Sequence, residues 1–196
     1  MKGAGGSFGI VTQMYFKTFP IPEDVTYFSY VWTLDVQKSA ETLLAFQSWS
    51  LHSNVPKELG IEHQLRAGPQ QGTLIVTVTG SWYGAPANFQ SVINPLLADY
   101  PSNPHQDVRV VSYLESLIIQ SDKGTLDTSK PDIPDSFYAK SLVVPEDNPM
   151  SPLAVSNLID VLIKSGSSNL IVSFVILILK LLLMLIHLYL GLVRCV

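Results

Sequence analysis

The chain has 196 residues, enough for one ordinary domain or for one domain with an appendage. Hydrophobic residues make up 47% of it and charged residues only 14%, which indicates that part of the sequence differs from a typical soluble domain. The formal net charge is −4 and no basic stripe with interleaved aromatic residues occurs, so we expect no nucleic-acid partner.

The cysteine and histidine content offers no disulfide and no metal site. The single cysteine, Cys195, has no partner for an intramolecular disulfide. The four histidines are scattered without the spacing of metal ligands, so we expect no bound metal ion. Met1 and Lys2 lead directly into a glycine-rich stretch, without the apolar segment of a secretory signal peptide.

Residues 3–9 contain four glycines, and residues 8–19 that follow are typical of a strand. Glycine permits positive φ angles and close approach of the backbone, so such a turn can present N–H groups to an anion. A dinucleotide-binding fingerprint would continue into a helix, and a phosphate-binding P-loop would end in Gly-Lys-Ser/Thr. Neither the helix nor the Gly-Lys-Ser/Thr ending occurs here. Residues 3–9 could therefore form either a cofactor contact or an ordinary turn before a strand.

The next segments alternate between strand and helix patterns. Residues 25–34 are rich in β-branched and aromatic types and predict a strand, whose aromatic rings could form either a sugar-stacking platform or the sheet core. Residues 38–51 place apolar side chains at helical spacing. Residues 59–67 and 73–83 predict two antiparallel strands around a turn, the second with one covered and one wetter face.

The pattern then repeats. Residues 86–99 predict a helix that Pro95 should kink or split, and residues 108–114 predict a strand. A polar loop follows, then a strand over residues 137–144 and a helix that begins at Ser151-Pro152. The order predicts an α+β fold, with an antiparallel sheet backed by helices.

The composition changes at the C-terminal end, where residues 170–190 are almost entirely apolar. About twenty apolar residues can cross a bilayer as a helix. Lys180 would cost about 3 kcal/mol at mid-membrane, which the surrounding apolar residues offset at about 0.3 to 0.6 kcal/mol each. We therefore expect a C-terminal hydrophobic helix over residues 170–192, a candidate transmembrane helix, arising either from a true anchor or from a gene-model artefact.

Several motifs, in order along the chain, resemble one enzyme family. Residues 3–12 and residues 135–142 are similar to the Gly-Ala-Gly-Gly-(Gly)-Ser-Phe-Gly-Ile-Val-Thr and Phe-Tyr-Ala-(Lys/Asn)-Ser-Leu segments of the FAD-linked oxidases of the berberine-bridge-enzyme type. The fungal glucooligosaccharide-oxidase-like members are the most similar. Between these motifs Trp49, residues 56–59 and residues 80–84 fall in the right order. The resemblance covers residues 3–164.

The resemblance implies a domain organisation and a cofactor. Residues 1–20 would be the end of the FAD-binding domain and residues 21–165 part of the substrate domain, so the chain would be a fragment. The family's flavin oxidises a sugar hemiacetal or similar alcohol and passes the electrons to oxygen. By the same resemblance, the residues that contact FAD would be Gly3, Gly5, Gly6, Ser7, Gly9 and Val11.

The family's flavin-linking residues and catalytic tyrosine match no segment of this chain, so we assign no catalytic residue. Glu62 and Gln64 lie on the strand that in these oxidases contributes to the sugar groove, and we expect alternation to let only one of the two face it. Tyr138 could contact the ligand or pack in the sheet.

Two hypotheses follow. The first is a fragment of an FAD-dependent oxidoreductase for a carbohydrate-like substrate, inactive as this chain alone. The second is a non-enzymatic binding module anchored in a membrane through residues 170–190. The first implies a secreted parent protein and the second a membrane location, and the sequence leaves open the substrate, the electron acceptor and the oligomeric state.

Overall fold

The computed structural model describes residues 12–13, 15–18, 20–52, 54–121, 124–127, 129, 137–165, 170–179 and 181–191. Within these ranges, the side chains of residue 52, residues 137–141, residue 170 and residues 175–191 are outside the description.

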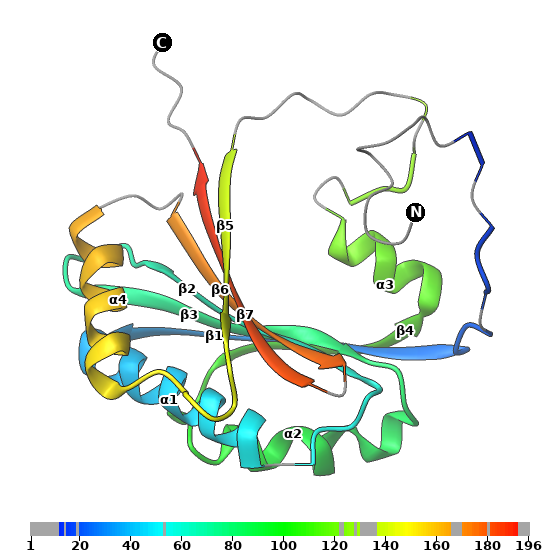
Figure 1. Ribbon diagram of the computed structural model, residues 1–196. Coiled ribbons are helices and arrows are strands. Elements are labelled where there is room, and N and C mark those ends of the chain that lie inside the picture. The colour runs from blue at the N-terminus through cyan, green and yellow to red at the C-terminus, as the bar shows by residue number, and fades with distance from the viewer. Residues whose placement is uncertain are drawn as a thin grey trace.

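One antiparallel sheet of seven strands organises the described chain (Figure 1). Its order is β4-β1-β3-β2-β6-β7-β5, and every neighbouring pair is antiparallel. The strands are β1 (Asp24–Asp35), β2 (Leu59–Ala67), β3 (Thr73–Trp82), β4 (His105–Ser112), β5 (Phe137–Val144), β6 (Leu170–Leu179) and β7 (Leu181–Gly191). The α+β class with helices against an antiparallel sheet is therefore as the sequence predicts.

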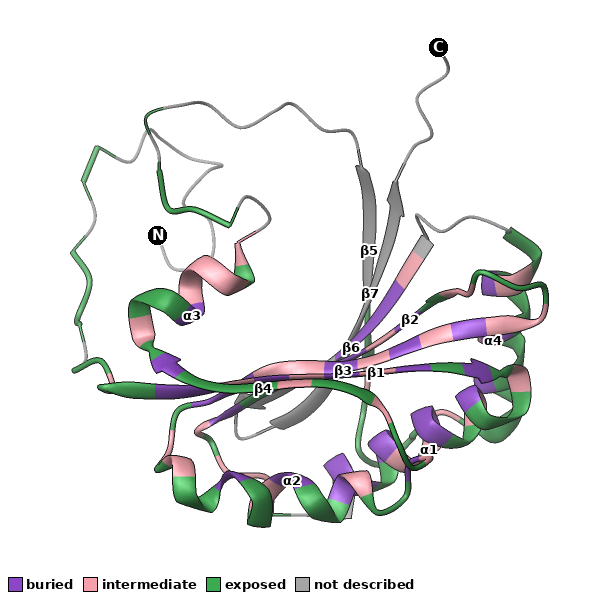
Figure 2. Cartoon of the chain, turned by 180° about the vertical axis from the view of Figure 1, so that it is seen from behind, coloured by how far each residue is buried: buried purple, intermediate pink, exposed green. Residues whose placement is uncertain are grey.

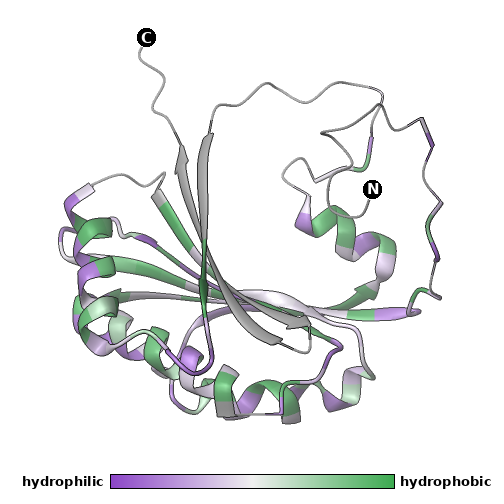
Figure 3. Ribbon diagram, viewed as in Figure 1, coloured by the Kyte–Doolittle hydropathy of each residue, from purple (hydrophilic) through white to green (hydrophobic). Residues whose placement is uncertain are grey.

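Three helices cover one face of this sheet, and a fourth lies on the other face (Figure 1). α1 (Val36–His52), α2 (Phe89–Leu97) and α4 (Pro152–Ser165) contribute to the core, while α3 (Tyr113–Gln120) is the fourth. A 3₁₀ turn, η1 (Pro86–Asn88), precedes α2. Hydrophobic and hydrophilic residues alternate along the helices (Figure 3), as expected where one side packs on a sheet.

Helices α1 and α4 begin at capping side chains that the sequence provides. The Asp35 carboxylate accepts a hydrogen bond from the backbone N–H of Lys38 at 2.8 Å, at the start of α1. At α4 the Ser151 hydroxyl accepts from the N–H of Ala154 at 3.2 Å, and Pro152 is the first helical residue, as the sequence predicts. Each cap gives a partner to an N–H group that has none within the helix.

The core lies between the sheet and the three helices (Figure 2). On β1 the alternate residues Phe28, Tyr30 and Trp32 face it, and each exposes at most 5% of its surface. The Phe28 ring lies 5.0 Å from the Phe89 ring of α2, between centroids. These three aromatic residues therefore belong to the sheet core, the second of the two alternatives that the sequence left open.

The middle of this core contains a histidine. His63 of β2 is completely buried, with its ring centroid 5.3 Å from that of Phe46 and 6.1 Å from those of Tyr100 and Phe174. Neither ring nitrogen has a hydrogen-bond partner among the described residues. Burial lowers the pKa of His63 to about 3, because a charged imidazolium would lose its hydration there. His63 is thus a neutral core residue.

The residues 80–84 motif has a structural role at the end of β3. Gly80 pairs with Phe28 on one side and Ile61 on the other, and a Cβ there would meet the Gly60 carbonyl oxygen and lie 2.8 Å from the Phe28 ring. The buried Trp82 donates its indole N–H to the Ala85 carbonyl at 2.9 Å, and Gly84 lies against the Trp82 ring. Close packing therefore requires both glycines.

The C-terminal apolar stretch is a pair of strands, and the predicted helix over residues 170–192 is wrong. β6 and β7 form a hairpin on either side of Lys180, and β6 also pairs with β2. A continuous apolar run fits a strand buried on both faces as well as a helix, so the run alone does not choose between them. Within the described residues, no helix has the length and apolarity needed to span a membrane.

Three smaller predictions also need correction. The described part of the strand expected over residues 8–19, namely residues 12–13 and 15–18, has no regular secondary structure, and no described strand pairs with it. The strand expected over residues 108–114 ends at Ser112, because the Ser112 hydroxyl caps α3 by accepting from the N–H of Glu115 at 3.2 Å. Of the kink or split expected at Pro95, the split does not occur, since Pro95 lies inside α2 close to its end.

The burial of His63 predicts an acid-dependent loss of stability. The folded-state pKa of about 3 lies below the ordinary value of 6.5, so the unfolded chain binds the extra proton first as the pH falls. The stabilisation from neutral His63 is complete above about pH 6.5 and decreases below it, by about 2 kcal/mol at pH 5. Urea unfolding at several pH values should show that His63→Leu removes this part of the acid sensitivity.

Tyr100 is the titratable neighbour in ring contact with His63, and burial raises its pKa well above the ordinary value, so its hydroxyl stays neutral throughout this range. The exposed His105 offers a matched control, and His105→Asn should keep the pH dependence of the parent chain. Identical pH profiles for the parent and His63→Leu would contradict the assignment.

Gly60 of β2 and Gly80 of β3, which are one register position apart, give a second prediction. Gly80→Ala should lower the free energy of unfolding by about 1 to 3 kcal/mol or more, because the new methyl group meets backbone and an aromatic ring. Gly60→Ala is the matched control, since the nearest atom to its Cβ is the Ser81 carbonyl oxygen at 3.7 Å. Equal urea midpoints for the two variants would show that Gly80 is not required for packing.

Candidate functional site

The sheet face opposite α1, α2 and α4, here called the open face, carries polar side chains next to the core positions. Successive residues of a strand point to opposite faces. On β2, Glu62 and Gln64 flank the buried His63, and on β3, Thr77 and Thr79 flank the buried Val78. All four polar residues are only partly buried. The open face therefore gathers hydrogen-bonding groups over the centre of the sheet.

The strand register brings these groups together. Gln64 lies between Thr77 of β3 and Ser173 of β6, and Glu62 pairs with Thr79. The expectation that only one of Glu62 and Gln64 faces this side is wrong, because residues two apart in a strand share a face. The structure therefore places both residues in one polar patch.

α3 and one edge strand border the open face (Figure 1). Gln120, at the end of α3, donates from its amide to the hydroxyl of the buried Ser81 at 3.0 Å, which links the helix to β3. On β4, Arg109 Nε and Nη2 each lie 2.9 Å from a carboxylate oxygen of Asp107. The same guanidinium lies over the Tyr27 ring, 5.6 Å from its centroid. Arg109 thus contacts both Asp107 and Tyr27 at this end of the face.

The open face can bind a hydroxylated ligand. The Thr79 hydroxyl donates to the Phe28 carbonyl oxygen at 3.0 Å, which leaves its own oxygen as an acceptor. The side chains of Glu62 and Gln64 have no hydrogen-bond partner among the described residues. A carboxylate, an amide and hydroxyl groups together accept from and donate to a ligand's hydroxyls. Within the same part of the chain, no group of His, Cys, Asp and Glu residues could hold a metal ion.

Of the other predicted site residues, the structure describes only the backbone of Tyr138. The proposed FAD contacts Gly3, Gly5, Gly6, Ser7, Gly9 and Val11 lie outside the described residues. The backbone of Tyr138 is at the end of β5, opposite Leu190 of β7. The strand register relates the Tyr138 position through β7 to β6, where it corresponds to a position three residues before Ser173. Because residues of a strand alternate between faces, the Tyr138 position is in register with the His63 row and not with the Gln64 row.

Three members of the patch were not predicted from the sequence. The alternation of polar and apolar residues around Thr77 and Thr79 is evident in the sequence. It does not show which residues of the neighbouring strand lie beside these two threonines. Ser173 was hidden in the apolar stretch interpreted as a helix. It is the one polar residue before Lys180 in that stretch, and as a strand residue it falls opposite Gln64.

Comparison with curated proteins finds oxidases that carry flavin or act on oligosaccharides. The chain is 31% identical over 148 residues to a xylooligosaccharide oxidase of Thermothelomyces thermophilus, a match that spans 73% of this chain and 28% of that protein. It is 34% identical over 115 residues to an FAD-linked oxidoreductase of Metarhizium anisopliae, with 59% of this chain and 21% of that protein covered. No protein-family model matches the chain.

Solved structures share the fold. A berberine-bridge-enzyme-like protein of Physcomitrella patens superposes with a TM-score of 0.71 at 18% identity and covers 90% of this chain and 40% of its own. A glucooligosaccharide oxidase of Acremonium strictum, described with a 6-S-cysteinyl, 8α-N1-histidyl FAD, gives a TM-score of 0.69 at 15% identity, with 89% and 40% covered.

The chain thus spans less than a third of the length of the curated relatives above and two fifths of these solved structures. The similarity nevertheless extends over most of its own length and is found both in sequence and in fold. The chain belongs to the FAD-linked oxidases of the berberine-bridge-enzyme and oligosaccharide-oxidase type, of which it covers a part.

Proposed function

We propose that this chain forms the substrate-facing sheet of an FAD-dependent oxidoreductase that oxidises a carbohydrate or a similar alcohol, with oxygen as the electron acceptor. The observation that carries the proposal is the similarity to a xylooligosaccharide oxidase over 73% of the chain. The polar open face agrees with it, because an oligosaccharide presents many hydroxyl groups and few charges. The alternative of a membrane-anchored binding module rested on a helix in the C-terminal stretch, and residues 170–179 and 181–191 are instead strands of the same sheet.

The domain boundaries follow from this proposal. Residues 1–20 would be the end of the FAD-binding domain, and the substrate domain would begin at residue 21. The sequence-based limit at residue 165 is extended to residue 191, because β6 pairs with β2 in the middle of the sheet. The strands after residue 165 are therefore part of the unit that any experiment must retain.

FAD would supply the hydride acceptor when bound. This chain's proposed contribution is the glycine-rich stretch of residues 3–11, whose N–H groups could approach the nucleotide closely. The remaining contacts would come from sequence of the kind that the longer relatives carry outside the matched segment. No step of the reaction is assigned to a residue of this chain.

Substrate contacts are proposed at Glu62 and Gln64. Both side chains lie on the open face beside hydroxyl groups and have no partner among the described residues, so a ligand would not have to displace an existing bond. The carboxylate of Glu62 can accept from two sugar hydroxyls, and the amide of Gln64 can both accept and donate. Tyr138, whose position on β5 is in register with the His63 row, is the weaker candidate.

The first test concerns the cofactor. The purified chain of 196 residues, mixed with FAD and passed through gel filtration, should retain far less than one flavin per chain, because one glycine-rich turn gives only part of the contacts a flavin needs. It should also produce no peroxide from xylobiose. The xylooligosaccharide oxidase, treated in the same way, is the positive control. A yellow protein with one flavin per chain would overturn the proposal that the chain alone does not bind FAD.

The second test concerns the substrate face. The matched segment of the xylooligosaccharide oxidase is replaced by that of this chain, and the flavin content reports whether the chimera assembles. In the chimera, Gln64→Ala and Glu62→Gln should each raise KM about fivefold to tenfold, the loss expected for one hydrogen bond. Gln70→Ala, in the exposed turn between β2 and β3, is the matched control and should leave KM unchanged. A KM that does not respond to either open-face variant would refute the assignment.

A further inference from the structure

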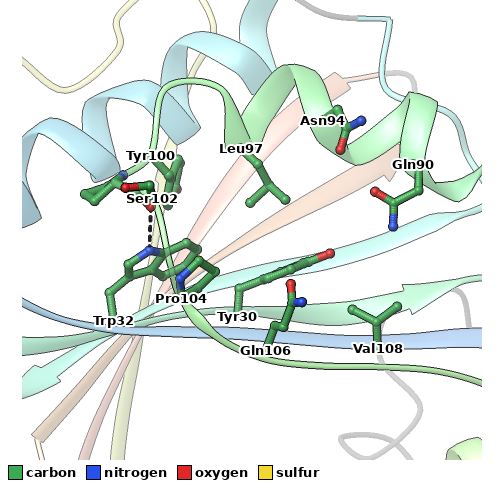
Figure 4. A pocket seen from close by; sticks show the side chains of 11 residues that line it. Tyr30, Trp32, Gln90, Asn94, Leu97, Tyr100, Ser102, Pro104, Gln106 and Val108 are labelled. Carbon is green, nitrogen blue, oxygen red and sulfur yellow. Dashed lines mark hydrogen bonds between the residues drawn. The ribbon is translucent and has the colours of Figure 1, made fainter.

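A pocket lies on the side of the sheet away from the open face, between α2 and the strands β1 and β4 (Figure 4). Its volume of about 430 Å³ is within the range of small-molecule sites. Tyr30 and Trp32 of β1 form part of its floor, and α2 forms the opposite wall. Since Tyr30 and Gln64 lie on opposite faces of the sheet, the pocket and the polar patch are separate places.

The residues at the floor of the pocket contact one another and the segment after α2. The Trp32 indole N–H donates to the carbonyl oxygen of Pro101 at 2.9 Å, which ties the segment after α2 to the sheet. The Trp32 ring centroid lies 5.1 Å from that of Tyr100 and 6.2 Å from that of Tyr30. A ligand would therefore meet a preformed surface, which lowers the entropy cost of binding.

Polar groups from three elements converge on the pocket. Tyr30 exposes only 3% of its surface, yet its hydroxyl has no hydrogen-bond partner among the described residues and points between Gln90 and Gln106 (Figure 4). Gln90 and Asn94 come from α2, and Gln106 comes from β4. The three amides likewise have no side-chain partner in the described chain. Burial raises the pKa of Tyr30, so its hydroxyl remains neutral and can donate as well as accept.

The lining defines the class of ligand. None of the residues that line the pocket is charged, so an ionic ligand would leave its hydration without gaining a counter-charge. Leu97 and Val108 add apolar surface beside the amides. Carboxamides and hydroxyls both donate and accept, which matches the dual character of sugar hydroxyls, while the apolar residues match the C–H surface of a sugar ring.

We propose that this pocket is a second saccharide-binding site, which takes a neutral sugar unit on the face of the sheet opposite to Glu62 and Gln64. Such a site would hold one part of a longer carbohydrate, or a separate one, away from the open face. It requires no flavin and no residue outside the described chain. Its failure would therefore leave the proposal for the open face untouched, and the reverse also holds.

Binding can be followed in the complete chain by NMR. The chain has three tryptophans, so its spectrum should show three indole N–H signals, of which Trp32 is assigned with Trp32→Phe. Titration with xylobiose should shift the Trp32 signal and the side-chain amide signals of Gln90 and Gln106 in a saturable way. N-acetylglycinamide, a neutral ligand without hydroxyls, is the comparison probe. Absence of any saturable shift with xylobiose, or an equal response to both probes, would overturn the proposal.

Variants locate the response. Gln90→Ala combined with Gln106→Ala should weaken xylobiose binding at least about tenfold, since two hydrogen-bonding side chains are removed. Both residues are exposed, so the three indole signals should otherwise keep their positions and report an intact fold. Gln70→Ala, in the exposed turn between β2 and β3, is the matched control that should bind as the parent does. Equal loss in the Gln70→Ala control, or full binding by the double variant, would contradict a site in this pocket.

Discussion

The structure depends on one constraint, which is that alternate residues of the four central strands must be buried under helices. The row of Tyr30, Val78, His63 and Phe174 crosses β1, β3, β2 and β6 in register, and each of these side chains is almost completely buried. Removal of this apolar surface from water is the main favourable term for such a layer. Once one face is fixed in this way, the residues between must point to the other face.

This constraint explains why both candidate sites lie on the same strands. The sequence can place polar residues such as Gln64 and Thr77 on the open face without any loss of core packing. On the covered face, the largely buried Tyr30 and Trp32 line a pocket beside α2. One strand, β1, therefore contributes Tyr30 to the pocket and the neighbouring Ser29 to the open face.

Local periodicity was sufficient to predict β1, β2, β3, α1 and α4, because each has a pattern that no long-range contact overrides. It was not sufficient for the C-terminal stretch, where the choice between helix and strand depends on pairing with β2, more than a hundred residues earlier in the chain. The patch could be predicted only in part. Glu62 and Gln64 were identified by resemblance, whereas their neighbour Ser173 could be identified only once β6 was known to be a strand. The pocket could not be predicted, because α2, β1 and β4 meet only in the folded chain.

The sheet order has a consequence for the way in which the chain acquires its structure. β1 to β4 can pair as soon as residue 112 has left the ribosome, but β5 has β7 as its partner and must wait for residues 181–191. Until the hairpin of β6 and β7 arrives, the outer side of β2 has unpaired N–H and C=O groups, and such an edge is a template for association between chains. The last residues of the sheet to be synthesised are thus the ones that close its centre and protect the nascent protein from aggregation.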